Sequence, residues 1–213
     1  MKLILEADIS SFFDKIVRPT LLEMLQERIA DKSFKRLVSK CLHVGVLDGE
    51  SFFRPEVGAV QGSIISPMFG NIYLHKALDK WFEEEVKGRL KGRSVLIRYC
   101  DDFIIGFEHM EDATRVMRVL GKRMERFGLS LHPDKTRLLE FQRPEREQKG
   151  GKGPGSFDFL GFTLYWRRNR GRTGWHMSFK TRKARLGRAI KALHNQCRRQ
   201  RYWSVPMQPQ ALV

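Results

Sequence analysis

Two adjacent acidic residues stand at the tight turn between two apolar runs, and this feature limits what the chain can fold into. Asp101 and Asp102 follow the run 94–99 and precede the run 103–107, so the pattern predicts an antiparallel hairpin with the acids at its turn. A third acid, Asp8, ends another apolar run close to the amino end. Carboxylates flanked by buried strands are costly unless something neutralises them.

A divalent metal ion would neutralise such acids, and carboxylate oxygens suit Mg²⁺. We expect the strand at residues 3–7 to pair with the hairpin, which would bring Asp8 next to Asp101. Two or three carboxylates can hold two metal ions ~4 Å apart, an arrangement that serves phosphoryl transfer. The alternative interpretation is that Asp101 and Asp102 are ordinary turn residues, because Asp is favoured in turns.

The chain is strongly basic. Its 213 residues include 40 Lys or Arg against 24 Asp or Glu, which gives a formal net charge of +16. This charge favours a polyanionic partner, nucleic acid first and an anionic membrane second. The segment from Arg167 to Arg201 carries thirteen Lys or Arg and no acidic residue, and we expect a basic helix within it.

The three cysteines indicate neither a disulfide-bonded fold nor a structural metal site. Cys41, Cys100 and Cys197 are scattered and form no CxxC pair, so neither a set of disulfides nor a zinc site is indicated. No apolar run approaches the ~18 residues that a membrane span needs. We therefore expect a reduced, cytoplasmic protein without a membrane partner.

The order of the expected elements defines the fold class. Apolar periodicity and turn residues predict, in chain order, a strand at 3–7, helices at 19–29, 34–42 and 66–86, the hairpin at 94–107, a helix at 111–127, short strands at 129–131 and 136–141, a strand at 157–166, and its partner at 174–179. This order makes an α+β fold, an antiparallel sheet with helices on one face.

Five sequence blocks stand in an order that carries a family resemblance. They are Asp8–Ile16, Val60–His75, Arg98–Asp102, Gly128–Thr136 and Phe159–Phe162. Together they resemble the palm of reverse transcriptases, most closely of the group II intron type. The third block is similar to the family's Tyr-x-Asp-Asp box and the last to its primer grip. One block is weakly specific, whereas five in order are highly specific.

The resemblance implies an RNA-directed DNA polymerase, which transfers a nucleotide from a dNTP to a primer 3′-hydroxyl on an RNA template. It implies that Asp8, Asp101 and Asp102 hold two Mg²⁺ ions, which Mn²⁺ could replace. The second acid of the box often supports the metal site rather than ligating it, which concerns Asp102. By the same resemblance Lys135 would neutralise or protonate the leaving pyrophosphate; a solvated surface lysine is the alternative.

The resemblance also assigns residues to the incoming nucleotide. These residues are Ile9, Phe13, Gln61 and Gly62. Phe13 would lie under the sugar and exclude a 2′-hydroxyl, and plain core packing is the alternative for it. Gln61 and Gly62 would let the backbone approach the nucleotide and template base, which a glycine permits.

Four further residues are expected at the primer and template. Tyr99 and Cys100 would pack under the primer end, and Leu160 and Gly161 belong to the block that resembles the primer grip. In the nucleotide block Val60 replaces the family's usual proline, a change that we expect to be tolerated.

The expected organisation is a palm at residues 1–166, followed at residues 167–213 by a basic hairpin and the first thumb helix. The fingers region, which precedes the first acid in this family, does not precede Asp8 here. We therefore expect a truncated form or one piece of a split protein, with the fingers on a separate polypeptide.

Two rival functions remain open. The first is a non-catalytic RNA-binding protein, a maturase-like splicing helper that keeps the fold and has lost polymerase activity. The missing fingers favour it, whereas the intact acids speak against it. The second is the palm of an RNA-dependent RNA polymerase, which shares the acids; Phe13 and the Tyr-x-Asp-Asp box argue for DNA synthesis instead.

Overall fold

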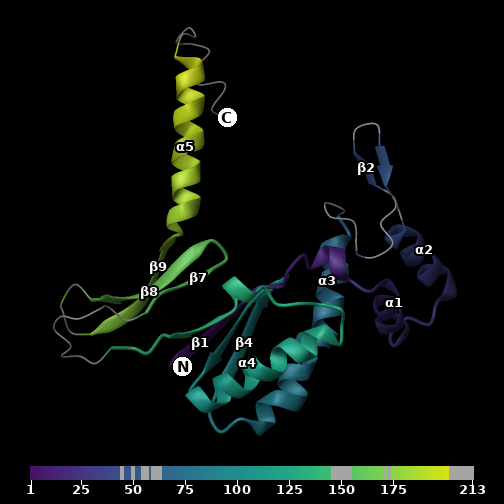
Figure 1. The fold of residues 1–213 in the computed structure, drawn as a ribbon, viewed down its shortest axis with the longest axis horizontal. Coiled ribbons are helices and arrows are strands. Elements are labelled where there is room, and N and C mark those ends of the chain that lie inside the picture. Colours follow the sequence, from purple (N-terminus) through teal and green to yellow (C-terminus); the bar gives the residue numbers. More distant parts are fainter. Residues whose placement is uncertain are drawn as a thin grey trace. The chain divides into compact units, whose positions relative to one another are not determined.

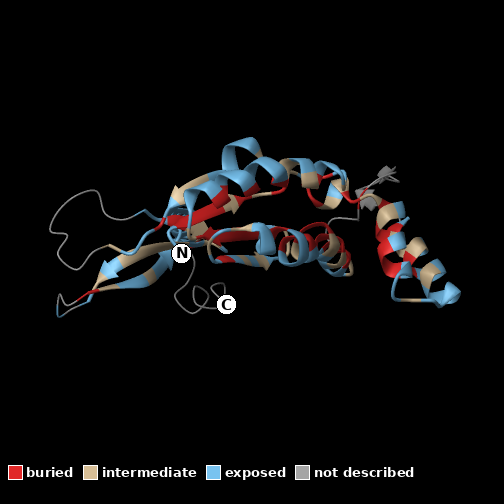
Figure 2. Cartoon of the chain, turned by 90° about the horizontal axis from the view of Figure 1, so that it is seen from below, coloured by how far each residue is buried: buried red, intermediate tan, exposed pale blue. Residues whose placement is uncertain are grey.

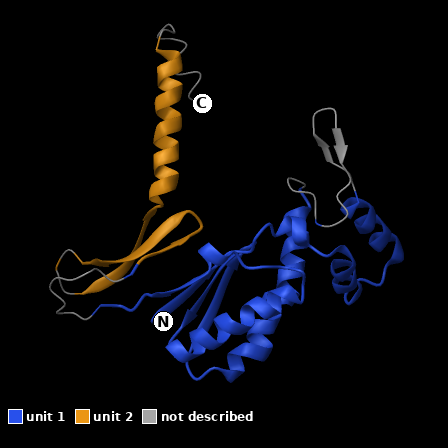
Figure 3. Cartoon of the chain, viewed as in Figure 1, with its two compact units in different colours: residues 1–155 blue, residues 156–213 orange. Residues whose placement is uncertain are grey.

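The fold consists of two compact units, residues 1–155 (unit 1) and residues 156–213 (unit 2) (Figure 3). The computed structural model describes residues 1–43, 46–48, 51–53, 58, 64–144, 155–169, 171 and 174–201.

Unit 1 is built on a four-stranded antiparallel sheet with the strand order β4-β5-β1-β6. Its strands are β1 (Leu3–Ala7), β4 (Ser94–Tyr99), β5 (Asp102–Phe107) and β6 (Arg137–Glu140). Strand β1 lies between β5 and β6, so a segment from the amino end occupies an inner position. This confirms the predicted pairing of the first apolar run with the hairpin.

The helices of unit 1 pack on the sheet and on one another. They are α1 (Arg18–Gln26), α2 (Lys32–Leu42), α3 (Ser66–Leu74), the π-helical segments η2 (His75–Lys80) and η3 (Phe82–Val86), α4 (Met110–Glu125), and the 3-10 turns η1 (Phe13–Lys15), η4 (Lys87–Arg89) and η5 (Pro133–Lys135). Helix α4 packs on β1 and β5 and against η2, while α1 packs against α2 and α3 (Figure 1). The arrangement is the predicted α+β fold.

The core of unit 1 lies between this sheet and the helices. Alternate strand residues such as Leu5, Ile105 and Phe107 are fully buried, and they meet helix residues such as Tyr73 and Phe82. Figure 2 shows the buried stretches along the facing sides of strands and helices. Burial of each such side chain contributes about 1.5–3 kcal/mol, so this single layer of contacts stabilises the sheet.

Three parts of unit 1 differ from the sequence-based expectation. The short strand expected at 129–131 is reduced to an isolated β-bridge between Leu131 and Ile9. The segment 66–86 is helical as expected, but it divides into α3 and two π-helical segments, because apolar spacing does not distinguish a bond to residue i−4 from one to residue i−5. The paired strands β2 (Val46–Asp48) and β3 (Ser51–Phe53) have no counterpart among the expected elements. Three residues are too few to show a periodic pattern.

Unit 2 contains a three-stranded antiparallel sheet followed by a helix. Its strands are β7 (Phe157–Phe159), β8 (Phe162–Arg168) and β9 (Trp175–Thr181), in that order, and its helix is α5 (Lys183–Gln200). The strand β9 and the basic helix α5 confirm the expected elements, but the single strand expected at 157–166 is a hairpin of β7 and β8, which turns at Leu160 and Gly161. None of the described helices is long and apolar enough to cross a lipid bilayer.

Candidate active site

The acids of the two blocks meet at the ends of β1 and β5. Ala7 pairs with Phe103, so the next step of the ladder brings Asp8 beside Asp102. Because Ala7 and Phe103 face the core, strand alternation turns both carboxylates to the opposite face of the sheet. A buried strand therefore delivers each acid to the open side of unit 1.

Asp101 lies in a two-residue turn. Tyr99 pairs with Asp102, so Cys100 and Asp101 connect β4 to β5. Cys100 has a φ of 54°, in the left-handed region that favours glycine. Two-residue hairpin turns commonly need a positive φ at the first central residue, and here a cysteine fills that position.

A cleft of about 530 Å³ opens beside this turn. Its lining residues come from the first, third and fourth of the sequence blocks: Asp8, Ile9, Ser10, Ser11, Phe12, Phe13, Asp14, Asp101, His132 and Lys135. The fold thus brings Asp8 and Asp101 into one cleft, whereas Asp102 is not among the lining residues.

Lys135 reaches the first acid directly. Its Nζ donates a hydrogen bond to Asp8 Oδ2 at 2.7 Å. The backbone holds this segment in place, because His132 N donates to the Asp8 carbonyl at 2.8 Å and Leu131 forms a β-bridge with Ile9. A cation is therefore delivered to the cleft by the short turn η5.

The acids are electrostatically coupled. Partial burial raises the pKa of the Asp102 carboxyl, the charges of Asp101 and Asp8 raise it further, and Lys135 lowers it. The carboxylates therefore repel one another, and a bound cation would relieve this repulsion. Their oxygen atoms are the ligands that hard divalent cations prefer, so the residues fit such an ion. In the described part of the chain, no three His, Cys, Asp or Glu side chains already form a metal-holding cluster.

Phe13 and Ile9 line the cleft from the segment that follows Asp8. The ring of Phe13 packs against Phe12 at a centroid distance of 5.1 Å and is partly buried. Gly70 of α3 makes room for both rings, since a Cβ there would lie 2.7 Å from Phe12 and 3.3 Å from Phe13. The side chain of Ile9 is buried, with 3% of its surface exposed.

The expected nucleotide residues Gln61 and Gly62 lie outside the described residues. The nearest preceding described residue is Gly58, whose carbonyl accepts a hydrogen bond from Arg18 Nε at 2.8 Å. Gly58 has a φ of 90°, and a Cβ there would come within 2.7 Å of the Phe13 carbonyl oxygen. Only glycine fits this close approach beside the turn that carries Phe13.

The four expected primer and template residues divide between the two units. Tyr99 is 65% exposed and Cys100 is half-buried, both in unit 1. Leu160 and Gly161 form the two-residue turn between β7 and β8 of unit 2, with φ values of 51° and 81°. Positive φ at both positions is typical of a tight hairpin turn, and Gly161 is a favoured residue for it.

Five cleft residues are not among the sequence-based candidates, namely Ser10, Ser11, Phe12, Asp14 and His132. His132 stands three residues before Lys135 in the same block, so its position in that block was an available signal. Ser11 has a φ of 48°, which nothing in a single sequence reveals.

Comparison with known protein families shows to which family the chain belongs. Residues 1–164 match the model of the family described as reverse transcriptase (RNA-dependent DNA polymerase). The match covers most of the chain and contains both acidic blocks and Lys135. The chain therefore belongs to the reverse transcriptase family.

Some of the relatives that match this chain are named as intron or intron-encoded proteins. The chain is 38% identical over 76 residues to the group II intron-encoded protein LtrA of Lactococcus lactis subsp. cremoris, covering 36% of this chain and 12% of LtrA. It is 26% identical over 180 residues to a COX1/OXI3 intron 1 protein of Saccharomyces cerevisiae, covering 62% of this chain and 22% of that protein. The chain spans between 10% and 42% of the lengths of the curated relatives that it matches.

Among solved structures, the fold is similar to that of telomerase from Candida albicans, solved in complex with a TWJ fragment of telomeric RNA. The TM-score is 0.58 and the sequence identity 18%, over 86% of this chain and 31% of the telomerase chain. At this identity the likeness concerns the fold alone, and it supports a polymerase palm of the α+β type.

Proposed function

We propose that this chain is the palm of an RNA-directed DNA polymerase of the group II intron type, which extends a primer 3′-hydroxyl with dNTPs on an RNA template. The observation that carries the proposal is the cleft where Asp8 and Asp101 meet, in a chain of the reverse transcriptase family. Residues 1–166 would form the palm, and residues 167–213 the basic hairpin and first thumb helix.

Members of this family use divalent metal ions, and the specific proposal here is two Mg²⁺ ions, which Mn²⁺ could replace. Asp8 and Asp101 would hold them, with Asp102 as a ligand or as a support. Bound metal would activate the primer hydroxyl and stabilise the leaving pyrophosphate. Lys135, which donates to Asp8, would neutralise or protonate that pyrophosphate.

The remaining roles follow the family blocks. The incoming nucleotide would be bound by Ile9, Phe13, Gln61 and Gly62. The primer and template would be bound by Tyr99, Cys100, Leu160 and Gly161. Partners of the chain would be the RNA template, a DNA or RNA primer, dNTPs and a separate polypeptide that carries the fingers.

The three cysteines are free, which suits the reducing cytoplasm as the proposed location.

The test is primer extension by the Asp101→Asn variant. Extension should fall roughly 10³-fold or more, because several kcal/mol of transition-state stabilisation depend on the metal site. RNA affinity should stay within about twofold, since the basic surface that meets the phosphates is unchanged. The matched control is Asp134→Asn, which removes an exposed acid of η5 that does not line the cleft.

The assay is run with the chain alone and with the remaining regions of a relative such as LtrA supplied, because the chain spans only part of its relatives. Extension by Asp101→Asn at the wild-type rate would contradict the two-metal assignment. RNA binding without any extension, even after supplementation, would favour the maturase-like binding function instead.

A further inference from the structure

The strand that leads into the acidic turn carries an arginine with an unusually complete set of partners. Arg98 Nε donates to Asp79 Oδ1 at 2.7 Å, and its Nη2 donates to Asp79 Oδ2. Its Nη1 donates to Asn71 Oδ1 and to the Cys100 carbonyl, both at 2.8 Å. The Arg98 side chain is only 12% exposed, so these bonds form in a largely desolvated place.

These partners come from three different elements. Asn71 belongs to α3, Asp79 to the π-helical segment η2, and Cys100 to the turn between β4 and β5. Arg98 therefore ties the acidic turn to the helical layer. A planar guanidinium can pair with both oxygens of one carboxylate and still bond a carbonyl, which a lysine ammonium cannot reproduce. Segments with π-helical turns occur frequently at functional sites.

The bonded carbonyl belongs to the one residue of the turn that has a disfavoured backbone. Cys100 has a φ of 54°, and a side chain at that angle costs free energy that a glycine would avoid. The turn therefore keeps this conformation only if surrounding contacts favour it. The bond from Arg98 Nη1 is such a contact, and it acts on the residue directly before Asp101.

We propose that Arg98 is a positioning residue, which holds the Cys100 carbonyl and so fixes the turn that presents Asp101 to the cleft. The inference rests on the proposed function, because the placement of the acids matters for catalysis only where they hold metal ions. Arg98 does not line the acidic cleft itself. It acts through the turn, with Asp79 and Asn71 as its anchor.

The first test compares Arg98→Gln with wild type in Mn²⁺ binding, followed by electron paramagnetic resonance, and in primer extension. We expect Mn²⁺ affinity to fall about tenfold and kcat about 100-fold with little change in the KM for the primer, since small displacements of catalytic groups cost rates of this order. Because Arg98→Gln removes both guanidinium bonds to the Asp79 carboxylate and leaves it, among the described residues, only His75 at 3.6 Å, the double variant Arg98→Gln/Asp79→Asn is measured beside it. Arg98→Lys should behave like Arg98→Gln.

The matched control removes another arginine of the same sheet. Arg137 Nε donates to Glu6 Oε2 at 2.8 Å, and its side chain is 51% exposed. Arg137→Gln removes the same charge and also breaks an ion pair, but it does not touch the turn. It should leave Mn²⁺ affinity and extension within about twofold of wild type, as expected for an exposed pair.

The discriminating test is a rescue by Cys100→Gly. If Arg98 acts by holding a disfavoured φ, a glycine at position 100 should recover most of the Mn²⁺ affinity and rate that Arg98→Gln loses. Absence of any recovery of Mn²⁺ affinity in the double variant, with Cys100→Gly alone binding Mn²⁺ like wild type, would overturn the proposal. A folded Arg98→Gln variant with wild-type Mn²⁺ affinity and rate would overturn it as well.

A second readout does not depend on polymerase activity. Replacing Cys41 and Cys197 with serine leaves Cys100 as the single thiol, since the chain has three cysteines. Arg98→Gln should then speed the reaction of Cys100 with a disulfide reagent several-fold, because the turn opens more often. An unchanged rate would reject the role of Arg98. If wild type does not bind Mn²⁺, while Arg98→Gln still speeds the reaction of Cys100, the role of Arg98 in the turn stands and the proposed function is rejected.

Discussion

The ring of Phe13 is partly buried against Phe12 and also lines the cleft that Asp8 and Asp101 share. A ring in this place would lie under the sugar of a bound nucleotide and exclude a 2′-hydroxyl. Phe13→Val should raise the incorporation of ribonucleotides relative to deoxynucleotides about tenfold or more, the usual effect of altering one apolar contact in a pocket. Primer extension with paired dNTP and rNTP substrates measures the ratio.

The control for this variant is Phe34→Val, which shortens an aromatic residue of α2 that is 40% exposed and lies outside the five sequence blocks. It should leave sugar discrimination unchanged. If Phe13→Val also leaves the ratio unchanged while it lowers the melting temperature, Phe13 is a core residue and its role as a sugar gate is wrong.

The limits of sequence reasoning are clearest at single residues. The acidic residues could be selected as candidates because each follows an apolar run, and strand pairing then brings them together. The partner of Arg98 could not be selected in this way, because Asp79 is one of many charges on a helical segment and only the fold brings it to β4. The left-handed φ of Cys100 is equally hidden, since the sequence shows no glycine at that position.

At the scale of elements, two helical glycines have opposite surroundings. A Cβ at Gly70 of α3 would lie 2.7 Å from Phe12, whereas a Cβ at Gly121 of α4 would meet nothing within 4 Å. Gly70→Ala should therefore destabilise the protein by about 1–3 kcal/mol through overpacking. Gly121→Ala should stabilise it by about 0.5–1 kcal/mol, because alanine loses less conformational freedom in a helix.

Urea unfolding measures both free energies, and each variant is the control for the other. If both variants change the free energy of unfolding by the same amount and with the same sign, the packing of Phe12 and Phe13 against α3 does not determine the effect of Gly70→Ala. If Gly70→Ala stabilises the protein, the rings of Phe12 and Phe13 move aside without any loss of stability.

The start of α4 is held by a buried acid. Asp112 is 1% exposed and accepts hydrogen bonds from the backbone N–H groups of Lys91 and Gly92, at 3.2 and 3.0 Å. Asp112→Ala should lower the free energy of unfolding by about 1.5–3 kcal/mol, the usual loss for hydrogen bonds to a charged group. Glu111→Ala, which removes an exposed partner of Lys91, should have a much smaller effect. Chemical denaturation measures the free energy of unfolding of both variants. A larger loss for Glu111→Ala than for Asp112→Ala would contradict the prediction.

Elements of the fold were predictable in proportion to their length and regularity. Helix α4 repeats buried residues at Val116, Leu120 and Met124, a spacing that only a helix explains. The strands β2 and β3 are too short for such a signal. The π-helical turns of η2 were also beyond reach, because they alter hydrogen bonding without altering which residues are apolar.

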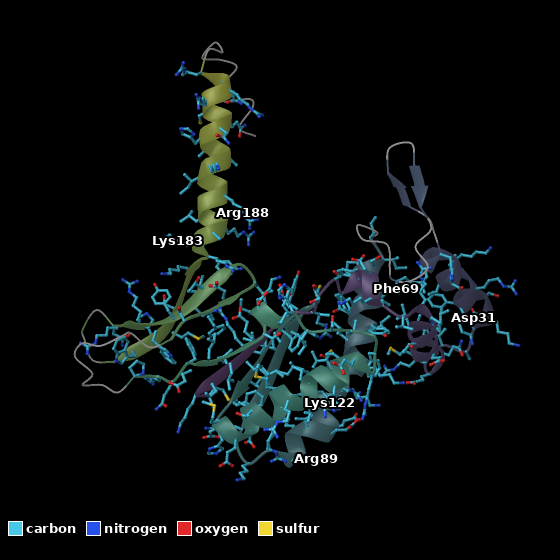
Figure 4. All side chains as sticks on the ribbon, viewed as in Figure 1. Asp31, Phe69, Arg89, Lys122, Lys183 and Arg188 are labelled. Atoms are coloured by element: carbon cyan, nitrogen blue, oxygen red, sulfur yellow. The ribbon has the colours of Figure 1, made fainter. Side chains whose placement is uncertain are left out.

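At the scale of the whole molecule, the helix α5 of unit 2 carries charged side chains of one sign only, all Lys or Arg. Lys183, Arg188 and Lys191 are exposed on α5, and Figure 4 shows the first two projecting from it. We expect these residues to contact the phosphates of bound RNA. Replacing all three with Gln should reduce the slope of log affinity against log salt by about 2–3 units, because each phosphate contact contributes 0.7–0.9. Titrations of primer–template RNA at several salt concentrations measure the slope.

The matched control removes three charges from the outer side of α4 in unit 1, namely Arg115, Arg118 and Lys122. Both triple variants change the net charge equally, so a general attraction between a basic chain and RNA predicts the same loss for the two. Specific phosphate contacts along α5 predict a flatter slope for the α5 variant only. Equal slopes in both variants would mean that the charge of α5 is a solvated face, and that this helix does not bind the nucleic acid backbone.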